Sequence, residues 1–364
     1  MNKNIRNIML EEILSLSKIL IAIPTVTGDE KSLELAVEIA YQDLYDYQVK
    51  KFKHNNISSL LYYNTEHIPD KFKILLSTNL DVVSAQESQF KPYEKNGKLY
   101  GRGAYDVKGA TAAMILAYKE IAKKVDYPVG LQIVADGEFD SQNIKHQIDQ
   151  GVRADFVISA IPTNFGISHM SKGMLWMKVK TTGKGAHSAS PWKGENAIWK
   201  MKHFLDQLEQ AFPDPKEEAW RTTVNVAKIS TTNDEFNNVP DNAEVLLDVR
   251  YIPEEEKTII TRIKTLLPQG FEYEIVLNDQ SESTNLENKE LKLLCESVEK
   301  VTGKKPQIIK KHYADSVRYF TPVGGYGASI GPIGGNEHAE NEWVDIQSLA
   351  DYYRALKEFL LAVK

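Results

Sequence analysis

Four side chains of types that bind divalent metal ions lie in segments suited to building a site. Asp81 and Glu138 follow apolar runs, Asp106 lies in a glycine-rich loop, and His338 lies in the polar segment GPIGGNEHAENEW. Carboxylate oxygens and imidazole nitrogens hold zinc, which polarises carbonyl groups and assists hydrolysis. These residue types therefore indicate metal-dependent hydrolytic chemistry, provided that the fold brings them together.

The segments around these residues alternate between strand and helix patterns. Residues 72–83, 129–138 and 154–163 are apolar runs that end in polar residues, as buried strands do. Between the first two runs, apolar side chains recur at helical spacing over residues 107–121. Continuous apolar strands that alternate with helices favour an α/β domain with a mainly parallel sheet covered on both faces.

In such a sheet, ligands bind beyond the carboxyl ends of the strands. Asp81, Asp106, Glu138 and Pro162 all lie at or just after predicted strand ends. This placement predicts one shared site for them. Polar residues also end strands merely to enter turns, so a purely structural role stays open for each.

The pattern changes near residue 170. A strand, a helix, two strands, a helix and a strand follow one another between residues 174 and 278, which is a compact α+β, ferredoxin-like unit. Helix and strand patterns of the first kind return after Ser281. We therefore expect residues 1–170 and 282–364 to form one domain, and residues 171–281 to be an inserted lid.

Length and composition are those of an ordinary globular protein. The 364 residues exceed the usual size of one hydrophobic core, and 42% are hydrophobic and 26% charged. A net charge of -6 gives no reason to expect nucleic acid or a membrane as partner. The lone Cys295 lies in a helical pattern, and the first residues favour an amphipathic helix over a signal peptide, so we expect a cytoplasmic protein.

Seven stretches, in order along nearly the whole chain, resemble one family of dizinc peptidases and deacylases. That family includes aminoacylase, acetylornithine deacetylase, succinyl-diaminopimelate desuccinylase and glutamate carboxypeptidase. The stretches are IPTVTGDE, LDVV, KLYGRGAYDVKG, VADGEFDS, GKGAHSA with GENAI, NNVPDNAEVLLDVR, and GPIGGNEHAENEW. The resemblance implies a split catalytic domain with a zinc-peptidase-type mixed, mainly parallel sheet, an inserted lid, and a homodimer formed through that lid.

The resemblance assigns metal ligands residue by residue. Asp106 matches the family's bridging aspartate, and Glu138 and His338 match the other ligands of one metal ion, which we expect to be Zn²⁺. The partner ion normally uses a histidine and an acidic residue, where this chain has Asn79 and Ile161. The resemblance therefore implies one retained metal site and the loss of the second.

The family's general base is also missing. Two adjacent glutamates are usual at this point, whereas this chain has Gly137 before Glu138, and glycine cannot take a proton. A shifted alignment would make Glu138 the base but would place Phe139 at the ligand position. The acidic or imidazole groups that could substitute for the base are Asp136, Asp140, His312 and Asp315. Asp81 keeps its family position, where it orients the missing histidine by a hydrogen bond; a structural role in a turn is the open alternative.

The substrate side matches the family better. His187 corresponds to a lid histidine that reaches the partner subunit's active site and polarises the scissile carbonyl, and Asn238 to a lid residue near the substrate. Arg318 resembles the arginine that binds the substrate carboxylate, with spacing that differs by about one residue. Arg250 matches a further family arginine, with a structural ion pair as the alternative.

Two kinds of function remain. The first is an amidohydrolase acting on small N-acyl amino acids or peptides, with one metal site and without the standard two-zinc reaction. The alternative is a noncatalytic pseudoenzyme that binds a small carboxylate-bearing ligand or pairs with an active relative.

Overall fold

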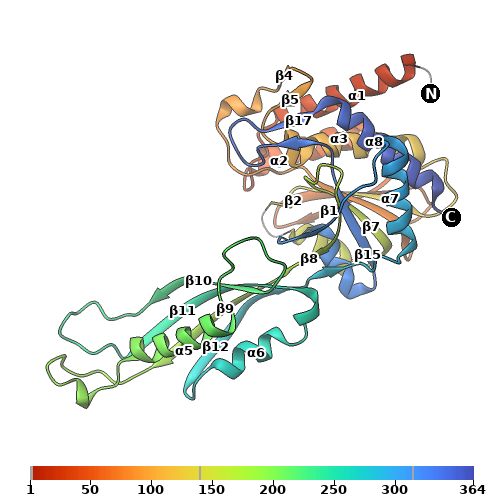
Figure 1. Ribbon diagram of the computed structural model, residues 1–364. Coiled ribbons are helices and arrows are strands. Elements are labelled where there is room, and N and C mark those ends of the chain that lie inside the picture. Colours follow the sequence, from red (N-terminus) through yellow and green to blue (C-terminus); the bar gives the residue numbers. More distant parts are fainter. Residues whose placement is uncertain (1–2, 139–140, 314) are drawn as a thin grey trace. The chain divides into compact units, whose positions relative to one another are not determined.

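The structure, a computed structural model, describes residues 3–138, 141–313 and 315–364 and divides into two compact units (Figure 1). The larger unit comprises Met1–His169, Ser283–Ile309 and Asp315–Lys364, and the smaller unit comprises Met170–Glu282 and Lys310–Ala314. We expected residues 310–314 in the larger part. They group with the smaller unit because Lys311 O accepts a hydrogen bond from Lys172 N (3.2 Å) and the Trp220 ring contacts Lys310 and His312.

A mixed sheet forms the centre of the larger unit, and its middle is parallel as predicted. The order is β1-β2-β6-β3-β7-β15-β8-β13, with β14 paired to β8. The pairs β6–β3, β3–β7 and β7–β15 are parallel, whereas the hairpin β1–β2 joins β6 antiparallel. The strands are β1 Gln48–His54, β2 Ile57–Tyr63, β3 Phe72–Asn79, β6 Val129–Val134, β7 Ala154–Ala160, β8 Ile167–Ser171, β13 Glu282–Ser283, β14 Ile308–Lys311 and β15 Tyr326–Ile330.

Apolar side chains on both faces of this sheet are buried, so the strands show no polar alternation. Ile74 and Leu76 of β3 pack into the main core with the helices, while Leu75 between them packs on the opposite face with α4. The helices are α1 Lys3–Ala22, α2 Glu30–Asp43, α3 Gly109–Ile121, α4 Gln142–Asp149, α7 Lys289–Thr302 and α8 Ile346–Ala362. In the described part of the chain, every helix is too short or too polar to cross a bilayer.

A second, small sheet of the larger unit holds the loops that carry site residues. Its order is β16-β17-β5-β4, and all of its pairs are antiparallel. Its strands are β4 Tyr93–Lys95, β5 Lys98–Tyr100, β16 Gly334–Gly335 and β17 Trp343–Asp345. This sheet brings the glycine-rich loop after β5 beside the loop between β16 and β17, although more than two hundred residues separate them in the chain.

The smaller unit is a four-stranded antiparallel sheet with two helices, in the predicted strand and helix order. The sheet order is β10-β11-β9-β12. Along β9, Leu175, Met177 and Val179 are buried under the helices while Trp176 and Lys180 are exposed, as alternation requires. The elements are β9 Gly173–Thr182, α5 Ala197–Ala211, β10 Thr223–Ser230, β11 Asn242–Tyr251, α6 Ile259–Leu266 and β12 Phe271–Asp279.

Candidate metal centre

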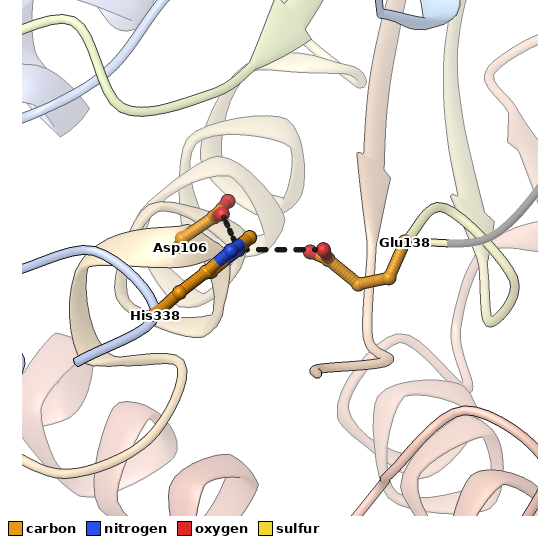
Figure 2. Close-up of side chains that lie close together, drawn as sticks. All are labelled: Asp106, Glu138 and His338. Atoms are coloured by element: carbon orange, nitrogen blue, oxygen red, sulfur yellow. Dashed lines mark hydrogen bonds and ion pairs between the residues drawn. The ribbon is translucent and has the colours of Figure 1, made fainter. Parts of the chain in front are cut away.

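Asp106, Glu138 and His338 come together in the larger unit from three separate segments (Figure 2). Asp106 lies in the turn Ala104–Lys108 that leads into α3, Glu138 lies beyond the end of β6, and His338 lies between β16 and β17. His338 Nε2 is 3.0 Å from Asp106 Oδ2 and 3.5 Å from Glu138 Oε2. One ligand atom from each residue lies within 4.8 Å of the others, so the three side chains face one point.

This donor set fits one divalent metal ion. Carboxylate oxygens and imidazole nitrogens are both zinc ligands, and a set of three protein ligands leaves a fourth position open for another ligand. The Asp106 and Glu138 side chains are only 12% and 13% exposed, whereas that of His338 is 46% exposed. Two nearly buried carboxylates thus lie beside an accessible imidazole, which is an arrangement that can bind a cation.

Burial and mutual contact shift the pKa of each group in this cluster. Burial raises the pKa of Asp106 to about 6, against the hydrogen bond from His338, and burial also raises the pKa of Glu138. The hydrogen bonds to Asp106 and then to Glu138 raise the pKa of His338 to about 10. Burial and the neighbouring charge of Asp106 raise the pKa of Glu337 to about 7. The raised pKa of His338 indicates that the two carboxylates favour a positive charge beside them.

Glu342 and Arg102, which sequence reasoning missed, hold two of the three candidate ligands in place. Glu342 Oε1 accepts hydrogen bonds from the amides of Tyr105 (2.9 Å) and Asp106 (3.0 Å). Its Oε2 pairs with Arg102 Nη1 at 2.6 Å, and Arg102 Nη2 donates to His338 O at 2.8 Å. Both side chains are buried. Their presence in the motifs GRG and HAENEW was the available signal, but the motifs do not reveal the pairing.

Asp81 is buried beneath the loop that carries Glu138. Its Oδ1 accepts hydrogen bonds from Gly137 N (2.8 Å) and Asn79 Nδ2 (3.1 Å). Its Oδ2 accepts from Glu138 N (2.9 Å) and Thr27 Oγ1 (3.3 Å). Burial raises the pKa of Asp81 to about 6 in spite of these donors. Asp81 thus accepts hydrogen bonds from the backbone of the loop segment that carries Glu138.

The positions at which a second metal ion would need ligands have other contacts. The Asn79 side chain is hydrogen-bonded to Asp81, and it occupies the space into which a side chain at residue 137 would extend. Ile161 follows β7, and its amide donates to Ile330 O at 3.4 Å. An aliphatic side chain supplies no ligand atom.

Three of the four candidate replacements for the general base, Asp136, His312 and Asp315, do not join the cluster. Asp136 accepts hydrogen bonds from the backbone and side chain of Asn143 at the start of α4. Asp315 accepts from Val317 N and from the Ser329 hydroxyl, and His312 contacts Glu218 in the smaller unit. In the ranges that the structure describes, the candidate metal-binding group contains none of these three. Asp140 and Phe139 lie outside the described residues.

His187 and Asn238 are neighbours in the smaller unit. They form an antiparallel bridge between two loops, and both side chains are exposed. His187 Nδ1 accepts a hydrogen bond from Ala189 N at 3.1 Å, and Asn238 Nδ2 donates to Asn233 at 3.0 Å. The bridge therefore presents an imidazole and an amide side by side on the surface of this unit.

The two arginines have different surroundings. Arg318 lies in the 3-10 turn Ser316–Tyr319 of the larger unit, buried, with its guanidinium 4.6 Å from the centre of the Tyr319 ring. Arg250, on β11, pairs with Asp248 through Nε (2.8 Å) and Nη2 (3.0 Å), so the structural ion pair that was the alternative role for Arg250 is present. Arg250 also lines a cavity of about 250 Å³ together with Lys172 and His312.

Known proteins resemble this chain in sequence over most of its length. Residues 75–362 match the family model described as Peptidase family M20/M25/M40. A probable succinyl-diaminopimelate desuccinylase of Staphylococcus aureus strain Mu50 is 30% identical over 224 residues, which cover 51% of this chain and 56% of that protein. The chain thus spans little more than half the length of this curated relative. The succinyl-diaminopimelate desuccinylase of Nitratiruptor sp. is 24% identical over 96% of this chain and 99% of its own.

Solved structures share the fold. Aminopeptidase PepT of Bacillus cereus superimposes with a TM-score of 0.79 at 16% identity, over 97% of this chain and 99% of its own. The YXEP protein of Bacillus subtilis, described as a dinuclear metal-binding peptidase from family M20, gives 0.69 at 12% identity, over 98% and 99%. With the family model covering most of the sequence, the chain belongs to peptidase family M20/M25/M40.

Proposed function

We propose that this protein is a one-metal amidohydrolase that acts on small N-acyl amino acids or peptides, with the family's two-metal reaction lost. The observation that carries the proposal is that Asp106, Glu138 and His338 converge, whereas Asn79 fills the space beside Gly137. A Zn²⁺ ion held by the three residues would act as a Lewis acid toward an amide carbonyl. Asp106 and Glu138 would neutralise its charge, and His338 would complete the ligand set.

The missing glutamate sets the expected rate. A positioned general base contributes roughly 10²–10⁴-fold to such reactions. No side chain can extend from Gly137 into the space that Asn79 fills, so we expect a rate lower by at least this factor than that of a family member with both glutamates. Asp136 remains hydrogen-bonded to Asn143 and does not replace the base.

The basic side chains of Lys172 and Arg250, which line a cavity of the smaller unit, support an anionic ligand. Lys172 is buried, and its pKa is lowered by burial and then by the charges of Arg221 and Arg250. The cavity wall also includes Glu217 and Glu218, and Arg250 already contacts Asp248. Because guanidinium groups bind carboxylates in a forked geometry, we assign Arg250 to the carboxylate of the ligand. Arg318 and Asn238 stay candidates for further contacts.

His187 and the homodimer belong to the same proposal. We assign the larger unit to the catalytic domain, and the smaller unit, Met170–Glu282 with Lys310–Ala314, to a lid through which two copies pair in the cytoplasm. The exposed positions of His187 and Asn238 and the open edge of β10, where Val226 and Ile229 are exposed, support this assignment. Light scattering on the purified protein would detect the dimer, and a monomer at micromolar concentration would contradict it.

A second candidate is a noncatalytic protein that binds the same class of ligand. The packing of Asn79 against Gly137 favours it, because that packing leaves no room for a side chain that could take up a proton. A hydrolysis screen with N-acyl amino acids and dipeptides, in the presence of zinc, separates the two candidates. Turnover that disappears in Glu138→Gln supports the hydrolase, whereas ligand binding by calorimetry without turnover supports the binder.

A further inference from the structure

The carboxylate of Asp81 holds two consecutive backbone amides of the loop that carries Glu138. Asp81 is fully buried, and both of its oxygens accept two hydrogen bonds each. A carboxylate has about four acceptor positions, so its capacity is filled. Two of the donors are the amides of Gly137 and Glu138, at 2.8 and 2.9 Å.

These two hydrogen bonds, donated by the backbone amides of Gly137 and Glu138, restrict the position of the Glu138 side chain. Bonds to an ionised acceptor are stronger than neutral ones, and a buried carboxylate with paired donors cannot move without losing them. With its backbone held at residues 137 and 138, Glu138 extends its carboxylate to 3.5 Å from His338 Nε2. Asp81 is therefore connected to the candidate metal site through the main chain and not through the side chain of a candidate ligand.

Asn79 supports Asp81 and is not available to a second metal ion. Its Nδ2 donates to both Oδ1 (3.1 Å) and the backbone oxygen (3.3 Å) of Asp81. Its Cβ and Cγ lie where they would be 2.6 Å from a Cβ atom at Gly137. Asn79 is thus fixed on one side by hydrogen bonds and on the other by the glycine backbone.

We propose that Asp81 is a positioning residue for Glu138, which it aims at His338 through the amides of Gly137 and Glu138, and that Asn79 supports this arrangement. The inference rests on the proposed metal site, but it concerns how Glu138, one of the proposed metal ligands, is held in position. Residues that orient metal ligands typically contribute about 10–100-fold to metal affinity.

The test compares zinc affinities by competition with a chromogenic chelator. We expect Asp81→Asn to bind zinc at least tenfold more weakly than wild type, and Thr27→Val, which removes only the longest of the four bonds, to stay within threefold. Asp136→Asn is the matched control, because it alters a buried aspartate of the same loop that accepts hydrogen bonds from Asn143. Thermal unfolding of each metal-free variant separates loss of affinity from loss of fold.

The outcomes distinguish the two proposals. Wild type without zinc binding overturns the proposed function, whereas wild type with binding and Asp81→Asn within threefold of it overturns only the role of Asp81. Equal losses of zinc affinity in Asp136→Asn and Asp81→Asn also overturn that role. If Asp81→Asn does not fold, hydrogen exchange in wild type decides: the Gly137 and Glu138 amides must exchange more slowly than exposed loop amides, and unprotected exchange refutes the proposal.

Discussion

A Cβ atom placed on Gly137 would lie 2.6 Å from the Cβ of Asn79, closer than side chains pack in proteins. The contact involves the first side-chain carbon of residue 79, so it does not depend on the rotamer of Asn79. Gly137 and Asn79, which both depart from the family pattern, therefore pack directly against each other. A glutamate at position 137 together with any residue larger than glycine at position 79 requires the end of β3 and the loop after β6 to move apart.

Gly137→Ala should lower the free energy of unfolding by about 1–3 kcal/mol, because the added carbon overpacks a site with no free space. Urea denaturation measures this change. Gly185→Ala is the control, since a Cβ there would meet its nearest atom at 3.9 Å, and we expect a change within about 0.5 kcal/mol. In a double-mutant cycle with Asn79→Gly, the cost of Gly137→Ala should shrink. An unchanged cost in the cycle would show that the two residues do not interact.

Glu342→Gln should destabilise the fold by about 3–5 kcal/mol, because it leaves the buried guanidinium of Arg102 without its charge partner. It should also weaken zinc binding, since the hydrogen bonds to the Tyr105 and Asp106 amides lose an ionised acceptor. Asp206→Asn disrupts the exposed pair with Lys202 and should change stability by less than about 1 kcal/mol. Similar effects from both variants would contradict the role given to Glu342.

Arg250→Ala should weaken binding of an N-acyl amino acid at least tenfold while changing the free energy of unfolding by less than about 1 kcal/mol. The stability change is small because the Arg250 and Asp248 side chains are 32% and 28% exposed, which screens their pairing. Arg262→Ala, which disrupts the comparable pair with Glu255, should leave ligand binding unchanged. Calorimetric titration measures the affinities, and equal affinities in wild type and Arg250→Ala would restrict Arg250 to its structural ion pair.

Glu282 should make stability fall between pH 4.5 and pH 7. Burial raises its pKa from 4.5 to about 7, against the charge of Lys311. The folded state then holds the proton more tightly than the unfolded state, so stability is highest where Glu282 is protonated in both states and falls as pH rises through this window. Glu282→Gln should remove up to about 3 kcal/mol of that fall. Denaturation curves from pH 4.5 to 8 test this, and parallel pH profiles for variant and wild type would refute it.

Much of the frame of the site was predictable from local patterns. The apolar runs at 72–83, 129–138 and 154–163 became β3, β6 and β7, and helical spacing after Asp106 became α3. Because parallel strands end at the same edge of a sheet, the approach of Asp81, after β3, to Glu138, after β6, followed from these elements. Asp106 comes instead from the loop after β5 of the small antiparallel sheet. The hairpin β1–β2 was not predicted, since the lysines of QVKKFKH weaken its strand pattern.

The supporting contacts were not predictable, because they depend on long-range packing. Arg102 and Glu342 lie in separate motifs, and only the small sheet makes them a pair. The closeness of Gly137 to Asn79 is a matter of tenths of an ångström, which residue types do not encode. Arg318 was chosen by motif spacing, whereas the structure places its guanidinium on the Tyr319 ring.

Metal content tests the central claim most directly. The purified protein, reconstituted with excess zinc and freed of unbound ion, should contain one zinc per chain by inductively coupled plasma mass spectrometry. Glu138→Gln and His338→Ala should contain much less, while His312→Ala should match wild type. Two zinc ions per chain in wild type, or one zinc that persists in both Glu138→Gln and His338→Ala, would contradict a single site built from Asp106, Glu138 and His338.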